Sequence, residues 1–312
     1  MNEFNLHVIG CGSALSMHGR HPSAQVVRYN QLQCLIDCGE GTQDRLREAG
    51  IKSFKIDLIF ISHLHGDHVF GLPGLLSSFS HLKRTAPLTV FGPVGLRGFL
   101  ESIITFTSLK ITYPLHIVEN DADGCRELWF DGELQISAFP LNHRVPCNGY
   151  IFRERKQKPR FIKEKVEALR LTPLQIKAVE KGDNIVASGI EMPAAAFLHP
   201  PSALLSYAYC SDTRYDQRIT EWIKGVSVLY HETTFMEDKL DLADQTGHST
   251  TRQAAKIAAE SGAGCLITGH YSSRYKDLQP LLDEAKEVFD HALIAEEGKK
   301  YDLRSLANRG KY

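Results

Sequence analysis

Short apolar runs alternate with longer amphipathic segments along most of this chain. Residues 58–61 form an apolar run typical of a buried strand, and residues 6–9 and 134–139 also fit strands. Segments of helical period, such as residues 69–82 and 95–108, lie between such runs. Strands that alternate with helices indicate an α/β domain, and the pattern by itself gives no finer architecture.

Polar residues gather where the predicted strands end. The apolar run 203–210 leads into Ser211-Asp212-Thr213, and the run 226–230 leads into His231-Glu232. A further strand at 265–268 delivers His270. Catalytic groups of α/β proteins commonly lie in the loops after strands, so we expect these ends to form one site.

The densest polar cluster occupies residues 62–68 and follows the predicted strand at 58–61. It contains three histidines and an aspartate, which are ligand types that Zn²⁺ and similar ions prefer. His63 and His65 can share an ion only if the backbone there is extended or looped, because residues two apart on a helix face different ways. The adjacent Asp67 and His68 would more naturally reach a second ion. The alternative interpretation is a histidine-rich surface loop.

Further motifs extend this pattern through the chain. Residues 63–68 fit an HxHxDH signature, and the later motifs are Asn142-His143, Ser211-Asp212-Thr213, residues 231–235, Gly247-His248-Ser249 and residues 268–275. Their order resembles ribonuclease Z, the tRNA 3′-processing branch of the metallo-β-lactamase superfamily, from about Leu6 to about Leu303. The signature indicates only the superfamily, whereas the motifs around Glu232 and His248 narrow the resemblance to this branch.

The resemblance implies a fold and a set of ligands. The fold would be α/β, a four-layer αββα sandwich formed by a single domain over residues 1–312. Two Zn²⁺ ions per subunit are implied, with Mn²⁺ or Co²⁺ as other possibilities. The residues that would hold the first ion are His63, His65 and His143, those that would hold the second are Asp67, His68 and His270, and the one that would bridge both is Asp212.

Other residues receive roles from the same resemblance. Asp67 would orient the attacking water and receive its proton, although a ligated carboxylate is a weak base. Glu232 would hold His248 in the protonated form that donates to the leaving oxygen. Asp37, in a loop that resembles the family's DCGEGT loop, would fix the tautomer of a histidine ligand, with a helix cap as the alternative. Arg274 could meet a substrate phosphate or form a salt bridge.

A basic segment interrupts the second half of the pattern. Residues 153–181 contain ten Lys or Arg against four Glu, a net charge of +6, while the whole chain carries −1. Such asymmetry is typical of a surface that meets a polyanion. By resemblance, residues 153–185 form an inserted exosite arm with two short helices that grips tRNA, and Lys163 and Lys165 are candidate contacts. The chain has Thr172-Pro173-Leu174 where the family usually carries Gly-Pro-Leu, and a solvated helical hairpin is the alternative.

Composition sets limits on compartment and class. The 312 residues are 43% hydrophobic and include seven cysteines without regular spacing, which argues against a disulfide framework. We therefore expect a reducing, cytoplasmic location. We also expect no signal peptide and no membrane span. We expect no nucleotide cofactor, because the glycine turn at 10–13 lacks the third glycine of a dinucleotide motif.

The sequence therefore predicts a zinc-dependent endoribonuclease. Metal-activated hydroxide would attack the phosphodiester of precursor tRNA, remove the 3′ trailer and leave a tRNA 3′-hydroxyl. The family is typically homodimeric, so we expect a homodimer. The alternatives are a phosphodiesterase or sulfatase of the same superfamily that acts on a small ester, and a metal-binding protein that binds RNA without cutting it.

Overall fold

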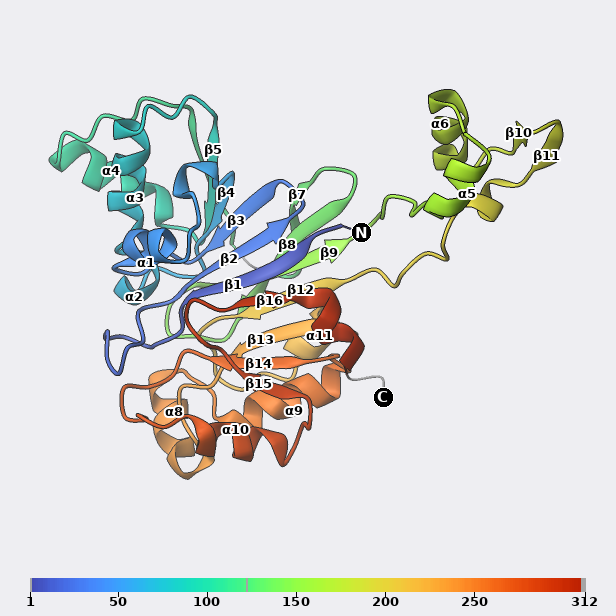
Figure 1. Ribbon diagram of the computed structural model, residues 1–312. Coiled ribbons are helices and arrows are strands. Elements are labelled where there is room, and N and C mark those ends of the chain that lie inside the picture. Colours follow the sequence, from blue (N-terminus) through green and yellow to red (C-terminus); the bar gives the residue numbers. More distant parts are fainter. Residues whose placement is uncertain (1, 122, 310–312) are drawn as a thin grey trace.

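Two seven-stranded sheets pack face to face in the computed structural model, which describes residues 2–121 and 123–309 (Figure 1). The ends of the predicted 1–312 span, Met1 and 310–312, lie outside the described residues. The first sheet has the order β16 (Lys300–Asp302), β1 (Phe4–Gly10), β2 (Ala24–Tyr29), β3 (Leu32–Ile36), β4 (Leu58–Phe60), β5 (Leu88–Gly92), β6 (Leu115–Glu119). The second has the order β15 (Ala292–Ile294), β14 (Leu266–Gly269), β13 (Val228–Glu232), β12 (Ser206–Cys210), β9 (Cys147–Glu154), β8 (Leu134–Leu141), β7 (Arg126–Phe130).

Helices cover the outer face of each sheet. Apolar side chains of the first sheet pack against α1 (Thr42–Glu48), α2 (Gly66–Val69), α3 (Leu72–His81) and α4 (Leu96–Phe106). Those of the second sheet pack against α7 (Ile219–Trp222), α9 (Thr251–Ser261) and α10 (Gln279–Lys286), while α8 (Leu240–Thr246) and α11 (Leu303–Arg309) complete the body. Short 3₁₀ turns occur at η1 (Ser53–Lys55), η2 (Ala194–Phe197) and η3 (Glu237–Lys239). The predicted α/β class and four-layer αββα sandwich are thus confirmed.

The largest core lies between the two sheets and explains why they stay together. Phe60 on β4 stacks on Phe91 with ring centroids 5.0 Å apart and meets Phe152 of the opposite sheet edge-on at 5.6 Å. Fully burying such a side chain stabilises the fold by about 1.5–3 kcal/mol. Ile59 packs among the helix residues on the other face of the sheet. Strand β4 is therefore held from both faces, which fixes the start of the polar loop that follows it.

Several strands of the second sheet end at one edge of that sheet, and the loops that follow them lie there. Strands β12, β13 and β14 are parallel, and β8 runs in the same direction because it is antiparallel to β9, which is antiparallel to β12. The carboxyl ends of these four strands consequently meet at one edge.

One predicted element differs from the structure. The expected helix at 69–82 begins only at Leu72, as α3, whereas Val69 ends the short helix α2. The two helices do not join, because the Gly71 amide donates to Cys38 O at 2.8 Å and Pro73 has no amide hydrogen. Residues 111–113 are irregular, because Tyr113 turns inward, where its hydroxyl donates to Leu76 O, and β6 begins only after Pro114.

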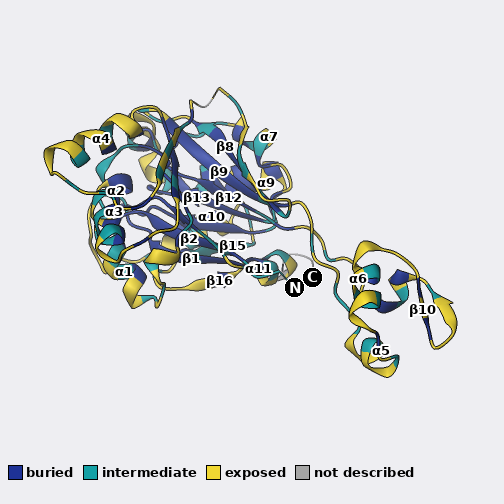
Figure 2. Ribbon diagram, turned by 90° about the horizontal axis from the view of Figure 1, so that it is seen from above, coloured by how far each residue is buried: buried dark blue, intermediate teal, exposed yellow. Residues whose placement is uncertain are grey.

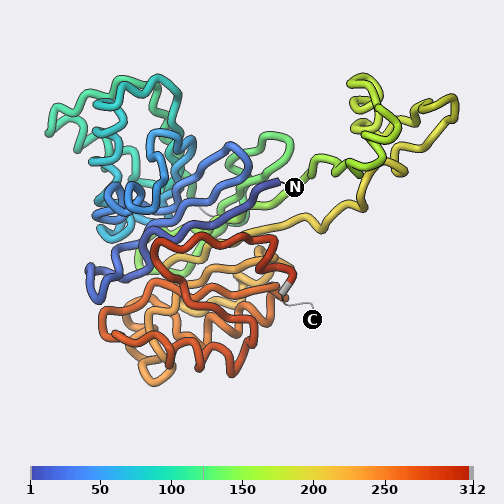
Figure 3. Tube along the Cα trace, in the orientation of Figure 1, coloured from blue at the N-terminus to red at the C-terminus, as the bar shows by residue number. Residues whose placement is uncertain are grey.

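The segment between β9 and β12 leaves the body as an arm on two single-chain connectors (Figures 1 and 3). It contains α5 (Lys163–Ala168), α6 (Pro173–Lys181), β10 (Ile185–Ala187) and β11 (Ile190–Met192), which confirms the two short helices expected there. The arm has a small core of its own, including Leu171, Val179 and Phe197, and most of its other surface is exposed (Figure 2).

Among the described residues, none of the helices combines the length and apolar character that crossing a bilayer requires.

Candidate active site

The polar loops predicted at the strand ends meet at one edge of the sandwich. Residues 62–68 follow β4, whereas the later motifs follow β8, β12, β13 and β14. The loop that carries Asp37 packs directly on this cluster, since a Cβ at Gly39 would lie 2.4 Å from Asp67 O. A side chain at Gly39 would push the two loops apart, which explains the need for glycine there.

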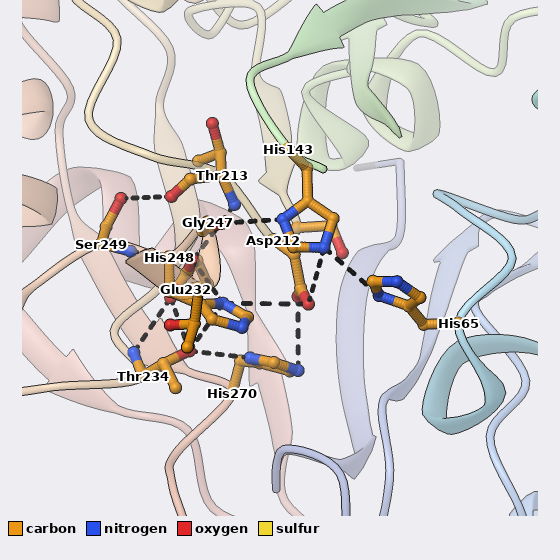
Figure 4. Close-up of polar contacts among 12 residues, drawn as sticks. His65, His143, Asp212, Thr213, Glu232, Thr234, Gly247, His248, Ser249 and His270 are labelled. Carbon is orange, nitrogen blue, oxygen red and sulfur yellow. Dashed lines mark hydrogen bonds and ion pairs between the residues drawn. The ribbon is translucent and has the colours of Figure 1, made fainter. Parts of the chain in front are cut away.

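One group of four side chains comprises His63, His65, His143 and Asp212, with one possible ligand atom from each within 4.8 Å of the others. His65 Nδ1 lies 3.0 Å from His63 Nε2 and 3.2 Å from His143 Nε2. His143 is oriented by its Nδ1–H, which donates to Gly247 O at 2.7 Å (Figure 4). Three imidazole nitrogens thus face one shared space.

A second group comprises Asp67, His68 and His270 and adjoins the first. His68 Nε2 lies 3.3 Å from His270 Nε2, and Asp67 Oδ2 lies 3.5 Å from the same His270 atom. Asp67 is also held by the Ala14 amide, which donates to its Oδ2 at 2.8 Å. His270 has a φ of 57°, a left-handed conformation that is uncommon outside glycine and is typical of functional positions.

Asp212 lies between the two groups and turns one oxygen toward each. Its Oδ1 is 3.4 Å from His68 Nε2 and 3.3 Å from His270 Nε2. Its Oδ2 is 3.6 Å from His63 Nε2 and 3.9 Å from His143 Nε2. Oδ1 is buried and has no hydrogen-bond partner among the described residues. A buried carboxylate oxygen without a donor is costly, and a cation would satisfy it.

The protonation states suit cation binding. Burial lowers the pKa of His63, His65 and His143, which favours the neutral imidazole that binds metals. Burial would also lower the pKa of His68, but the charges of Asp212 and other carboxylates raise it to about 10. The carboxylates that raise this pKa also attract a cation to the second group. Imidazole and carboxylate donors of this kind fit divalent zinc, manganese or cobalt.

Asp37 lies behind the clustered histidines and is fully buried. His68 Nδ1–H donates to its Oδ2 at 2.8 Å, and the hydroxyls of Tyr209 and Ser62 donate to the same oxygen. The alternative interpretation as a helix cap is wrong, since the N-cap of α1 is Gly41 and no side chain caps it. Asp37 therefore orients His68, so that its Nε2 faces the second group.

Glu232 and His248 form a buried pair beside Asp212 (Figure 4). Glu232 Oε1 accepts from His248 Nδ1–H at 3.0 Å and from the amides of Thr213 and Ser249. Burial would raise the pKa of Glu232, but the charge of His248 holds it below its usual value. Burial would lower the pKa of His248, but the charge of Glu232 raises it to about 9. His248 is thus protonated at neutral pH, with Nε2 left to donate.

The structure does not bring every predicted residue into this cluster. Arg274 is exposed, lies 5.8 Å from the Phe235 ring centroid and donates to Ser272 Oγ. The predicted salt bridge is not found among the described residues. Lys163 and Lys165 lie on α5 in the arm, where Lys165 Nζ donates to Ala196 O.

Sequence reasoning missed the hydroxyl groups that surround the imidazoles. Ser62 Oγ lies 3.0 Å from His63 Nδ1, and Thr234 Oγ1 lies 2.9 Å from His270 Nδ1. Both residues lie inside polar motifs of the sequence. Ser62 directly precedes His63, and Thr234 lies two residues after Glu232, and these positions were the available signal.

Comparison with known proteins gives one partial match to a family model and several full-length relatives. Residues 4–98 match a family model described as "Anti-Pycsar protein Apyc1". The chain is 39% identical over 298 residues to ribonuclease Z of Bacteroides fragilis (strain YCH46), covering 95% of this chain and 98% of that protein. It is 40% identical over 304 residues to ribonuclease Z of Porphyromonas gingivalis (strain ATCC 33277), covering 97% and 100%.

Among solved structures, the chain is similar to the short form of human tRNase Z. The TM-score is 0.70 with 24% identity, over 96% of this chain and 99% of that one. At this identity the similarity supports the shared fold.

Proposed function

This chain belongs to the ribonuclease Z family, and from that premise we propose that it removes the 3′ trailer from precursor tRNA as a metal-dependent endoribonuclease. The observation that carries the proposal is the convergence of seven histidine and aspartate side chains, able to hold metal ions, from distant parts of the chain. Full-length relatives that are 39% and 40% identical support the choice of tRNA as substrate.

We infer two Zn²⁺ ions per subunit, one in each group. The residues that would hold the first ion are His63, His65 and His143, those that would hold the second are Asp67, His68 and His270, and Asp212 would serve both. Bound there, the ions would make a water molecule acidic enough to attack at neutral pH and would stabilise charge on the phosphate. The positive charge of the two ions would exceed the negative charge of Asp67, Asp212 and a hydroxide. The remaining positive charge would attract a phosphodiester.

The remaining groups move or hold protons. Asp67, fixed by the Ala14 amide, would orient the attacking water. His248 Nε2–H would protonate the ribose 3′-oxygen as it leaves, so that the tRNA keeps a 3′-hydroxyl. His248 also lines a cavity of about 600 Å³ with Asn142 and Arg214, which has space for the nucleoside that carries this oxygen.

The arm supports a homodimer in which each arm serves the partner's site. Strand β9 starts at Cys147, whose sulfur is 3.7 Å from His63 Nδ1, and ends at Glu154, at the root of the arm. Eight residues of strand span about 25 Å, so the arm begins far from its own metal groups. A partner in antiparallel orientation would bring that arm beside the other subunit's site.

A reducing compartment such as the cytoplasm suits the cysteines, all seven of which are free, six of them buried.

The test is cleavage of a precursor tRNA transcript by zinc-loaded protein, with the product ends mapped and zinc content measured. We expect a single cut at the 3′ side of the tRNA body, a tRNA 3′-hydroxyl and two zinc ions per chain. Turnover of a small aryl phosphodiester without tRNA cleavage would instead support the small-ester alternative.

A further inference from the structure

Ser62 has a hydroxyl whose hydrogen-bonding capacity is completely used. The residue is fully buried, and its Oγ donates to Asp37 Oδ2 at 2.9 Å. The same oxygen accepts from His63 Nδ1–H at 3.0 Å and from the Ser211 hydroxyl at 3.0 Å. A serine hydroxyl has one hydrogen and two lone pairs, so these three contacts satisfy it.

Thr234 repeats this arrangement on the other side of the site. Its Oγ1 donates to Glu232 Oε2 at 2.7 Å and accepts from His270 Nδ1–H at 2.9 Å. The direction is fixed because the buried carboxylate can only accept, which leaves the hydroxyl's lone pairs to receive the imidazole hydrogen.

Each carboxylate also contacts a second imidazole directly. Asp37 accepts from His68 Nδ1–H at 2.8 Å, and Glu232 accepts from His248 Nδ1–H at 3.0 Å. Both carboxylates are fully buried, and among the described residues neither pairs with a Lys or Arg. Each carboxylate therefore interacts with two imidazoles. One donates to it directly, and the other is linked to it by the hydroxyl of Ser62 or Thr234.

We propose that Ser62 and Thr234 are positioning residues that each extend a buried carboxylate to one metal histidine, His63 for the first ion and His270 for the second. This inference rests on the two-ion site proposed above. A hydroxyl polarised by a carboxylate holds the imidazole Nδ1–H, so the Nε2 lone pair stays directed at the cation. The first ion then depends on Ser62 and the second on Thr234.

The test measures zinc affinity in two single-site backgrounds, by competition with a chromophoric chelator. His270→Ala would leave the first site, and His65→Ala would leave the second. Loss of an outer hydrogen-bond partner typically weakens metal binding about 10- to 100-fold. We expect that loss for Ser62→Ala in the His270→Ala background and for Thr234→Val in the His65→Ala background. For Thr234→Val in the His270→Ala background we expect a change of less than about threefold. Ser62→Ala in the His65→Ala background should weaken binding less than it does at the first site, because His68 keeps its direct bond to Asp37.

Matched variants separate hydrogen bonding from packing. Thr234→Val keeps the side-chain shape and removes the hydroxyl, whereas Thr234→Ser keeps the hydroxyl and should retain near wild-type affinity. Cys147→Ala removes the other atom near His63 Nδ1, a sulfur at 3.7 Å, and should leave first-site affinity unchanged. Thermal unfolding of the metal-free variants checks that each one folds.

Equal weakening of both sites by Ser62→Ala or Thr234→Val would overturn the proposal, as would no weakening at either site. A first-site loss in Cys147→Ala as large as that in Ser62→Ala would assign the contact to sulfur instead. Failure of the wild-type chain to bind two zinc ions would be a separate result, against the proposed metal site itself.

Discussion

Four of the clustered imidazoles have one nitrogen held by a neighbour and the other turned to the shared space. The held nitrogen is Nδ1 in each case, and the pairs are His63 with Ser62, His68 with Asp37, His143 with Gly247 and His270 with Thr234. His65 differs, because it turns its Nδ1 toward His63 and His143. At the scale of single residues, ligand geometry is thus determined by contacts that the HxHxDH spacing does not reveal.

Replacing His65 with alanine should abolish most hydrolysis while the fold survives. The change removes one donor of the first group, so the loss should exceed the roughly 10- to 100-fold that removal of an outer partner costs. Zinc content and pre-tRNA cleavage measure it. The matched control is His116→Ala, an exposed histidine on β6, which should keep full activity. Wild-type turnover in zinc-verified His65→Ala protein would refute the site.

Glu232→Gln should change the pH dependence of turnover. The negative charge of Glu232 raises the pKa of His248 to about 9, so the proton donor is available below that pH and lost above it. Without that charge the pKa falls, and the alkaline decline of kcat should move to lower pH, with a loss of about 10²- to 10⁴-fold where the acid is deprotonated.

A pH–rate profile of single-turnover cleavage checks this prediction. Glu221→Gln, an exposed residue on α7, should keep the wild-type profile. An unchanged alkaline decline in Glu232→Gln would show that another group supplies the proton.

At the scale of elements, some structures followed from local signals and others did not. Local signals set both ends of helix α9, because Thr250 caps its start through a capping box with Gln253 and Gly262 ends it with a φ of 66°. The hairpin of β10 and β11 was not predicted, since three-residue strands carry too little periodicity. Strand ends could be read from sequence, but their convergence depends on the pairing order of the sheet.

The net positive charge of the inserted segment lies in its first eight residues, at the end of β9 and in the connector that follows it. Residues 153–160 carry five Lys or Arg and one Glu, whereas residues 161–198 carry five basic and five acidic residues and are neutral. Arg155, Lys156 and Lys158 are exposed on this first connector. The positive charge of the arm therefore lies at its root more than on its helices, and we expect a polyanion to meet the root.

Charge reversal at Lys163 and Lys165 should weaken tRNA binding, and reversal at Lys156 and Lys158 should weaken it more. Removing one lysine–phosphate interaction should reduce the salt dependence of binding by about 1 in the log–log slope. Binding isotherms at several salt concentrations measure this, and hydrolysis of a small aryl phosphodiester serves as the control because it should not change. Unchanged tRNA affinity in both double variants would exclude the arm as a tRNA-binding surface.

At the scale of the whole molecule, the arm and the metal groups lie at opposite ends of β9. The two connectors leave the body side by side, since the Glu154 amide donates to Leu205 O at 2.9 Å and Arg304 of α11 contacts the Glu154 carboxylate. A short loop could therefore join residues 154 and 205 and remove the arm without disturbing the sheet.

Mixing two inactive variants should restore tRNA cleavage if each arm serves the partner's site. One variant lacks the arm and keeps its metal groups, and the other carries His65→Ala and keeps its arm. Random pairing makes half the dimers mixed, each with one complete site, so about a quarter of wild-type activity is expected. Either variant alone should stay inactive on tRNA, and no recovery on mixing would contradict service in trans.

The two extended connectors also expose the chain to proteases between two compact parts. A nick there would leave the body with its full set of metal-site side chains and free the arm, whose own core holds it together. On the proposed tRNA-binding role of the arm, the hydrolytic centre and the choice of substrate would be separable, and exchange of the arm alone would redirect an unchanged catalyst to a different nucleic acid.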